Sequence, residues 1–292
     1  MMKFIHIGMH RCGSTFLQTK LFPSIKELSL ISFNEDNPIS EEINRLILCA
    51  DLYYDREDAT NKIQKKLADH SFNCISSEGL SGMNDHYFGG YHVQHVAERL
   101  KYIFGETKIL IVIRNQKTCL PSTYHGEVRM GYLSSYKRWL LSRYKTFELN
   151  FLKYSRIIKC YQDIFGPENV SVSLYEEIFN KTEINRLLEE LGVNSNGVDN
   201  ADFNMKVNSS FSRPTIAMTK IMNRFFGSKL THNVNVGKDS RLTMYNCWRY
   251  TCASKLDQFS AKLGIKSKSY SFDEYDDLLY ELYHEDNLMT SK

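Results

Sequence analysis

The feature that most constrains the fold of this chain is its segment 3–17, which reads KFIHIGMHRCGSTFL. A short apolar run passes directly into a loop bounded by Gly8 and Gly13, and Ser14, Thr15 and further apolar residues follow. This pattern is typical of a buried strand that turns sharply into a helix, because glycine permits the close backbone approach that such a loop needs. We therefore predict an α/β fold with a parallel sheet to which this strand belongs.

The loop has the spacing of an anion-binding loop. From Gly8 to Thr15 it reads G-x-x-x-x-G-S-T, so Ser14 replaces the lysine of the nucleotide-binding pattern G-x-x-x-x-G-K-[ST]. Arg11, two residues before the second glycine, still supplies a cation. Backbone N–H groups at the start of a helix favour phosphate or sulfate, and the helix dipole adds to this effect. The alternative is a Ser/Thr-capped helix with no ligand, which leaves the glycines and the arginine unexplained.

A second strand-to-helix transition lies in residues 108–127, KILIVIRNQKTCLPSTYHGE. The run 109–113 is apolar and mostly β-branched, as in a strand buried on both faces of a parallel sheet. It ends at Arg114 instead of the aspartate that often holds magnesium in kinases and ATPases. We therefore expect an anion site without an obligatory metal. Ser122, on a helix that begins near Pro121, is placed to complete the shell around the anion.

These segments together resemble the sulfotransferases that use 3′-phosphoadenosine 5′-phosphosulfate. The resemblance rests first on a loop of the form [KR]-x-G-[ST]-[ST], which is residues 11–15 here. It rests next on an arginine followed eight residues later by a serine, here Arg114 and Ser122. The third landmark is a strand that ends in Tyr-Glu-[DE] before a helix, here at Tyr175. The three landmarks occur in the family's order over the first two thirds of the chain.

The resemblance implies binding roles for these positions. The loop of residues 11–15 would hold the 5′-phosphosulfate, and Arg114 with Ser122 would hold the 3′-phosphate. Aromatic side chains would lie against the adenine base. The residues expected to bind the nucleotide are Arg11, Cys12, Gly13, Ser14, Thr15, Phe16, Arg114, Ser122 and Tyr175.

The resemblance also implies an architecture and a donor. We expect a three-layer fold like that of P-loop nucleoside triphosphatases, with additional helices over the acceptor site. A single domain would span residues 1–292, with the nucleotide-binding core in 1–190 and a mostly helical part in 191–292. The donor would be 3′-phosphoadenosine 5′-phosphosulfate, the product 3′-phosphoadenosine 5′-phosphate, and no metal would be required. The family's Arg-Lys-Gly triplet is missing, and residues 206–214, KVNSSFSRP, are the candidate substitute.

Glu78 is the first candidate for the base that takes the acceptor's proton. It ends the strand-like segment 71–78. If the candidate strands are parallel, Gly8, Glu78 and Arg114 reach the same carboxyl edge of the sheet, where open α/β folds bind ligands. Partial burial and nearby cations tune the pKa of such a glutamate for base catalysis. The alternative is a structural glutamate that caps the next loop or pairs with an arginine.

The other catalytic candidates are a histidine and an arginine. His125 lies three residues after Ser122, hence on the same helical face, and is the second candidate for the base. Arg11 stays charged, so we assign it electrostatic stabilisation and not acid catalysis. His10 is expected to orient the loop. The stretch 84–95, NDHYFGGYHVQH, reads as an acceptor-facing loop followed by a helix, and its spacing matches no zinc site.

Composition limits the class of function. The formal net charge of +3 is weak and dispersed, so we expect no nucleic-acid partner. Seven cysteines without paired spacing suggest reduced thiols. We see no signal peptide and no apolar run of about 18 residues, so we expect a cytoplasmic protein similar to the soluble bacterial members of the family. With 18 Tyr and 17 Phe, a glycan or a phenol acceptor would suit equally.

Three functions follow from these observations. The first is sulfuryl transfer to a hydroxyl or amine of an acceptor, with a carbohydrate or glycolipid favoured. The others are a P-loop small-molecule kinase and a nucleotide-binding module without catalysis. The sequence does not determine the acceptor, the regiochemistry or the oligomeric state.

The rest of the chain is expected to be mostly helical. We predict helices near residues 40–52, 57–70, 93–105, 215–226 and 242–263, a long one over 136–166, and a solvated amphipathic helix over 271–287. In the long helix, Trp139, Tyr144 and Phe147 are expected to pack in the core.

Overall fold

The computed structural model describes residues 2–32, 39–70, 72–82, 90–201, 203, 212–226, 252–262 and 275–290. The chain divides into two compact units. The first comprises Met1–Asn115, Leu149–Val207 and Leu282–Lys292, and the second comprises Gln116–Glu148 and Asn208–Glu281. In this division residues 116–148 group with the later helices, and the single domain with a core in 1–190 stays a prediction.

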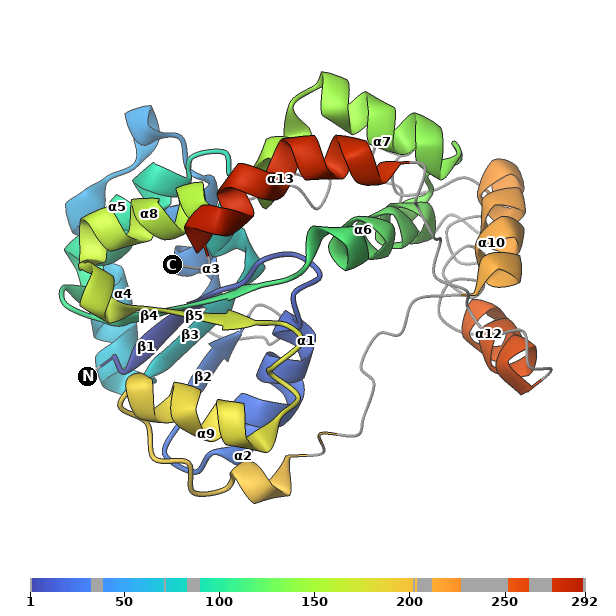
Figure 1. The fold of residues 1–292 in the computed structure, drawn as a ribbon. Helices are drawn as coiled ribbons and strands as arrows, with labels where there is room; N and C mark the ends of the chain where they lie inside the picture. The colour runs from blue at the N-terminus through green and yellow to red at the C-terminus, as the bar shows by residue number, and fades with distance from the viewer. Residues whose placement is uncertain are drawn as a thin grey trace. The chain divides into compact units, whose positions relative to one another are not determined.

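A parallel sheet of five strands forms the centre of the first unit (Figure 1). The strand order is β2-β3-β1-β4-β5, and every pairing is parallel. β1 and β3 are buried along their whole length, as expected of inner strands in a parallel sheet that is covered on both faces. The strands are β1 (Phe4–Ile7), β2 (Leu30–Ser32), β3 (Cys74–Ser77), β4 (Lys108–Ile113) and β5 (Val170–Leu174).

Helices cover both faces of this sheet (Figure 1). Helices α5 (Val93–Phe104) and α8 (Tyr154–Phe165) lie on one face, with α8 packed on β4 and β5, and α2 (Phe22–Ser24) and α9 (Lys181–Glu190) lie on the other. The predicted three-layer α/β fold is therefore confirmed. The remaining elements of this unit are α1 (Ser14–Phe16), the π-helix η1 (Leu17–Leu21), α3 (Ser40–Leu48), η2 (Asp51–Tyr53), α4 (Arg56–His70), η3 (Glu78–Ser81), η5 (Pro167–Asn169) and η6 (Val198–Asn200).

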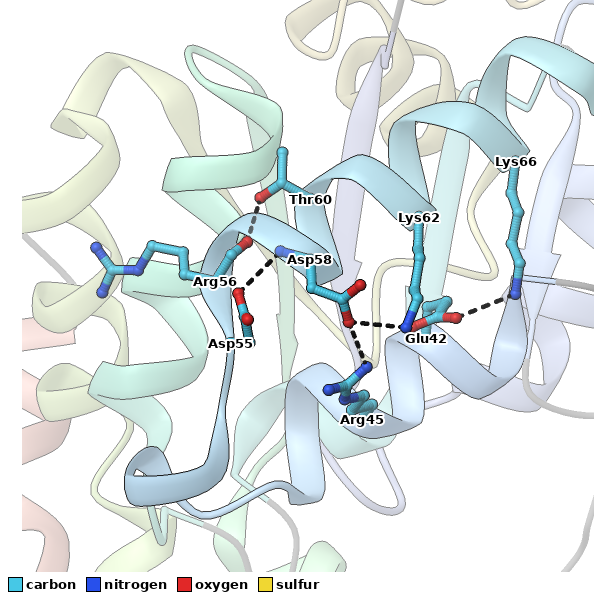
Figure 2. A network of polar contacts seen from close by, with 8 residues as sticks. All are labelled: Glu42, Arg45, Asp55, Arg56, Asp58, Thr60, Lys62 and Lys66. Carbon is cyan, nitrogen blue, oxygen red and sulfur yellow. Dashed lines mark hydrogen bonds and ion pairs between the residues drawn. The ribbon is translucent and has the colours of Figure 1, made fainter.

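Helices α3 and α4 are joined by an exposed polar network (Figure 2). The Asp58 carboxylate lies 2.9 Å from Arg45 Nη1 and 2.7 Å from Lys62 Nζ. Lys66 Nζ lies 3.3 Å from Glu42 Oε1. At the start of α4, the Asp58 N–H donates to Asp55 Oδ1 over 2.9 Å. The network therefore combines an N-cap with ion pairs within and between the two helices.

The second unit is helical in the part that the structure describes. Its helices are α6 (Gln116–Met130), α7 (Tyr136–Lys145), α10 (Arg213–Phe226) and α12 (Ala253–Lys262). α10 packs on α6 and α12, and Asn223 donates to the Val128 carbonyl over 2.7 Å. Arg143 pairs with Glu127 over 2.8 Å and with Glu148 over 2.7 Å. The helix α13 (Asp276–Thr290) contributes residues to both units, and the short helix η4 (Glu148–Leu152) also bridges the division of the chain.

Two expectations about the helices were wrong. The segment 136–166 is not one helix, because α7 ends at Lys145 and Phe147 has a φ of 60°, which an α-helix does not allow. Trp139 is buried as expected, but Tyr144 is 44% exposed and Phe147 is 75% exposed. The C-terminal helix is not simply solvated either, since Tyr283 is buried and donates to the Leu149 carbonyl over 2.9 Å.

Some expectations fall outside the described residues. These are residues 242–251 of one predicted helix, the acidic residues 271–274 and the segment 204–211. The predicted helices at 40–52, 57–70, 93–105 and 215–226 are present with ends shifted by a few residues. Across the described ranges, none of the helices combines the length and apolarity that a bilayer crossing requires.

Candidate functional site

The carboxyl ends of four strands converge on one edge of the sheet in the first unit. Gly8 follows β1, Glu78 follows β3, Arg114 follows β4 and Tyr175 follows β5. The register aligns Ile7 with Ser77 and with Ile111 on its two neighbours, and Ile113 with Leu174. The predicted parallel arrangement of the first, third and fourth strands is thus confirmed, and it brings four candidate residues to one edge.

The loop after β1 has the backbone of an anion cradle. Arg11 and Gly13 both have positive φ, 64° and 88°. The Cys12 N–H donates to the Met9 carbonyl over 3.2 Å, which closes the turn. Gly13 is the N-cap of α1 and has no side chain that could bind the N–H groups of the first helical residues. Those donors and the Arg11 cation suit a phosphate or a sulfate.

Gly13 is required for space as well as for backbone conformation. A Cβ at this position would lie 2.3 Å from Ile178 Cδ1 and 3.2 Å from Tyr175 Cδ2. The residues that follow β5 therefore pack directly against the loop that follows β1. Sequence reasoning identified Tyr175 but missed Ile178, whose only signal was its place three residues after Tyr175.

Arg114 connects the ends of three strands. Its Nη1 donates to the Arg11 carbonyl over 2.9 Å, and its guanidinium carbon lies 4.1 Å from the centre of the Tyr175 ring. The Tyr175 N–H donates to the Ile113 carbonyl over 2.7 Å, and Tyr154 Oη donates to the Arg114 carbonyl over 2.9 Å. Two cationic residues and a tyrosine ring therefore share one small region, with a geometry typical of cation–π stacking.

Glu78 lies directly beside the same loop. Its Oε2 is 2.9 Å from His10 Nδ1, with the glutamate side chain 36% exposed and the histidine side chain 9% exposed. A Cβ at Gly8 would lie 2.9 Å from Glu78 Cα, so the two backbones touch. Burial raises the pKa of the Glu78 carboxyl, but the hydrogen bond with His10 and the influence of Arg11 and Ser14 outweigh it and lower this pKa. Glu78 is therefore ionised at neutral pH.

A buried polar cluster lies beneath the loop. His6 Nδ1 is 2.7 Å from Ser76 Oγ, and Gln18 Nε2 donates to the same hydroxyl over 3.0 Å. Burial lowers the pKa of His6 to about 4, against the opposing field of Glu78. His6 is therefore neutral at the pH at which Glu78 is charged.

Phe16 packs in an aromatic cluster. It is 1% exposed, and its ring centre lies 4.9 Å from Phe179 and 5.9 Å from Phe203. Tyr175 contacts the same Phe179 ring at 5.3 Å in an edge-to-face arrangement. Phe16 thus stabilises the helix that follows the loop, and its stacking on adenine stays a prediction. Cys12 is equally buried, and its Sγ lies 3.5 Å from the His10 carbonyl.

Ser122 and His125 lie on α6 in the second unit. His125 is buried, and its ring centre lies 5.9 Å from that of Tyr124. Their contribution to a site with the loop residues stays a prediction. Asp85, His86 and most of the proposed 206–214 substitute lie outside the described residues. Among the residues that the structure describes, no three His, Cys, Asp or Glu side chains gather as metal ligands do.

Comparisons with known proteins identify the family of this chain. A family model described as "Sulfotransferase domain" matches residues 2–225. Among solved structures, the chain is similar to a sulfotransferase from Alicyclobacillus acidocaldarius, with 18% identity and a TM-score of 0.48. That match covers 77% of this chain and 91% of the other. No curated protein sequence matches this chain.

Proposed function

The chain belongs to the sulfotransferase domain family, and from that premise we propose that it transfers a sulfuryl group from 3′-phosphoadenosine 5′-phosphosulfate to an acceptor hydroxyl or amine. The observation that carries the proposal is the contact between two cationic strand ends. Arg114 after β4 binds the backbone of Arg11 after the neighbouring β1 over 2.9 Å. One ligand with two separated anionic groups suits this arrangement better than a single phosphate chain.

The residues of the loop fit the phosphosulfate end of the donor. The backbone N–H groups of residues 13–16, with Ser14 and Thr15, would bind the 5′-phosphosulfate, because these groups lie at the start of a helix and the Arg11 cation belongs to the same loop. Arg114 with Ser122 would bind the 3′-phosphate. The Tyr175 ring beside Arg114 would lie against the adenine.

The transfer itself is an in-line displacement at sulfur. The acceptor oxygen or nitrogen forms a bond to sulfur while the sulfur–oxygen bond to the 5′-phosphate breaks. The electron pair of that bond stays on the departing phosphate, where the Arg11 cation stabilises it. The acceptor's proton goes to Glu78. Two observations support this role: the Glu78 carboxylate is ionised, and it lies beside the loop. The remaining rate acceleration comes from holding the donor and the acceptor in the reactive geometry.

The acceptor is proposed to be a small molecule or glycan, with a carbohydrate or glycolipid hydroxyl favoured. His125 remains the second candidate for the base. Kinases and ATPases often place a metal-binding aspartate at such a strand end, where this chain has Arg114.

A ligand-binding comparison tests the proposal. Thermal shifts are measured with 3′-phosphoadenosine 5′-phosphate, ADP and ATP, each with and without magnesium. We expect the largest shift with the 3′-phosphorylated nucleotide, independent of magnesium. A larger shift with ATP and magnesium would favour the kinase. Transfer of labelled sulfate is then screened over carbohydrate, phenol and amine acceptors, and binding without any turnover would favour a module without catalysis.

A further inference from the structure

A contact between the nucleotide loop and the candidate base has no role in the proposed reaction so far. His10 is the third residue after β1, and Glu78 is the first after β3, the neighbouring strand. The His10 Nδ1 atom lies 2.9 Å from Glu78 Oε2. The His10 side chain is 9% exposed, which is much less than the 36% of its partner.

The two backbones are also in contact at this point. The space beside Gly8 is filled by Glu78, since an added Cβ would lie 2.9 Å from Glu78 Cα and 2.9 Å from its N atom. The Gly8 N–H donates to the Ser77 carbonyl over 2.9 Å. A movement of the loop therefore moves the backbone of Glu78, and the His10 contact extends this coupling to the carboxylate.

We propose that His10 is a positioning residue, which holds the Glu78 carboxylate against the nucleotide loop so that donor and base are placed by a single structural unit. This inference rests on the proposed function. A carboxylate offers acceptor positions on both oxygens, so binding to His10 at Oε2 is compatible with receipt of the acceptor's proton. A close polar contact on one carboxylate oxygen restricts the orientation of a base and so keeps it in a productive geometry.

Other groups also face Glu78. From the loop, Arg11 and Ser14 influence the carboxylate, and from β1 the neutral His6 lies beneath it. Helices α3 and α5 also pack on the turn that begins at Glu78. Several of their charged side chains bind elsewhere: Glu42 to Lys66, Arg45 to Asp58, and both Arg99 and His95 to Asp51.

Two substitutions at His10 separate positioning from packing. His10→Asn keeps an N–H donor near the place of Nδ1, whereas His10→Leu keeps a similar volume without a donor. The loss of a hydrogen bond to a charged group corresponds to roughly a 10- to 100-fold change. We expect His10→Leu to lower kcat by about that factor and His10→Asn to retain kcat within about threefold. Because His10 does not bind the donor in this proposal, both variants should bind 3′-phosphoadenosine 5′-phosphate with nearly the wild-type Kd.

A titration tests the contact without relying on turnover. The Glu78 carboxyl carbon is followed by NMR against pH in the full chain, with Glu78→Gln identifying its signal. His10→Leu should move the Glu78 midpoint to higher pH, because the hydrogen bond that favours the charged form is lost while burial remains. His10→Asn should stay near the wild-type midpoint. An unchanged midpoint in His10→Leu overturns the inference, whether or not sulfuryl transfer is the reaction.

A double-mutant comparison tests whether His10 acts through Glu78. In a Glu78→Gln background, His10→Leu should lower kcat by less than about twofold, since its effect depends on the carboxylate. Full additivity of the two losses would show that His10 acts independently, which overturns the inference. If His10→Leu does not fold, the Nδ1 signal of His10 is compared in wild type and Glu78→Gln, and an unchanged signal likewise overturns it.

Discussion

Two clusters of charged side chains in the first unit differ in what surrounds them. In the α3–α4 network, the pKa of Asp58 is lowered chiefly by its hydrogen bond to Lys62, and Arg45 adds to this (Figure 2). At the sheet edge, burial works against the charge of Glu78, and His10 with Arg11 overcomes it. Both carboxylates are ionised and their side chains are similarly exposed, 38% for Asp58 and 36% for Glu78, but Lys62 is 46% exposed whereas His10 is 9% exposed.

The surroundings of a charged side chain therefore decide how strongly it can affect catalysis. Ion pairs in solvent are screened and contribute little to stability, however many the network contains. The Glu78 carboxylate is partly desolvated beside the loop that follows β1, so its pKa responds strongly to each neighbouring group. Substitutions at the sheet edge should therefore change catalysis, and the same kinds of substitution in the α3–α4 network should not.

The largest effect is expected from Arg11→Ala. Loss of a positioned group that stabilises developing charge typically costs about 10²- to 10³-fold in rate. We expect kcat for sulfuryl transfer to fall by that factor, with a circular dichroism spectrum like that of the wild type. Lys62→Ala, a cation of the exposed network, serves as the control. Equal losses in the two variants would contradict the distinction between the clusters.

Glu78→Gln should have the next largest effect. Removing a general base typically lowers the rate by about 10²-fold. Glu183→Gln is the matched control, because its side chain has a similar exposure of 34% and also forms an ion pair, to Arg186 over 3.1 Å. Steady-state kinetics at several pH values provides the measurement. Turnover near the wild-type rate in Glu78→Gln would move the role to His125 or to another group.

An effect of intermediate size is expected for His6, which should make the folded protein less stable in acid. Between its ordinary pKa of 6.5 and its folded pKa of about 4, His6 binds a proton in the unfolded chain but not in the folded one. The free energy of unfolding therefore decreases as pH falls through this window. From pH 7 to pH 5 the loss attributable to His6 is about 2 kcal/mol.

Urea unfolding of wild type and His6→Asn at pH 7 and pH 5 measures this loss. The variant keeps an amide to contact Ser76 but has no proton to gain, so its stability should fall less between the two pH values. The lowered pKa of Glu78 does not interfere with this measurement. The stability that Glu78 contributes is lost as the pH falls below the ordinary glutamate pKa of 4.5. Identical decreases in both proteins would contradict the assignment of a neutral, buried His6.

The smallest effect is expected from Asp58→Asn. This change removes contacts to Arg45 and Lys62, but both partners stay solvated. We expect the melting temperature to remain within about 2 °C of the wild type and the rate of transfer to be unchanged. A shift several times larger would mean that the exposed network supports the fold as strongly as the sheet edge does.

The strands of the sheet differed in how well they could be predicted. β1 and β4 have mostly apolar runs that are followed by a glycine or an arginine, and both were predicted with the correct direction. β2 was missed because three residues, Leu30–Ser32, are too few to show a period. The break after α7 was missed because Phe147 adopts a left-handed backbone conformation, which is uncommon for a phenylalanine and cannot be predicted from its residue type.

The sequence by its local pattern predicted an anion-binding loop. Two glycines, an arginine and two hydroxyl residues at this spacing after a strand favour an anion site, because backbone donors at a helix start depend on local conformation only. Local spacing also identified Arg114, Tyr175 and Glu78 as residues that follow strands.

Only the tertiary structure decided how these residues meet. Sheet order placed β3 and β4 on either side of β1, which set Glu78 on one side of the loop and Arg114 on the other. The pairing of His10 with Glu78 follows from this order and from the contact at Gly8, and it joins positions 68 residues apart, 10 and 78. Such contacts depend on which strands are neighbours, and a single sequence carries no local pattern for that choice.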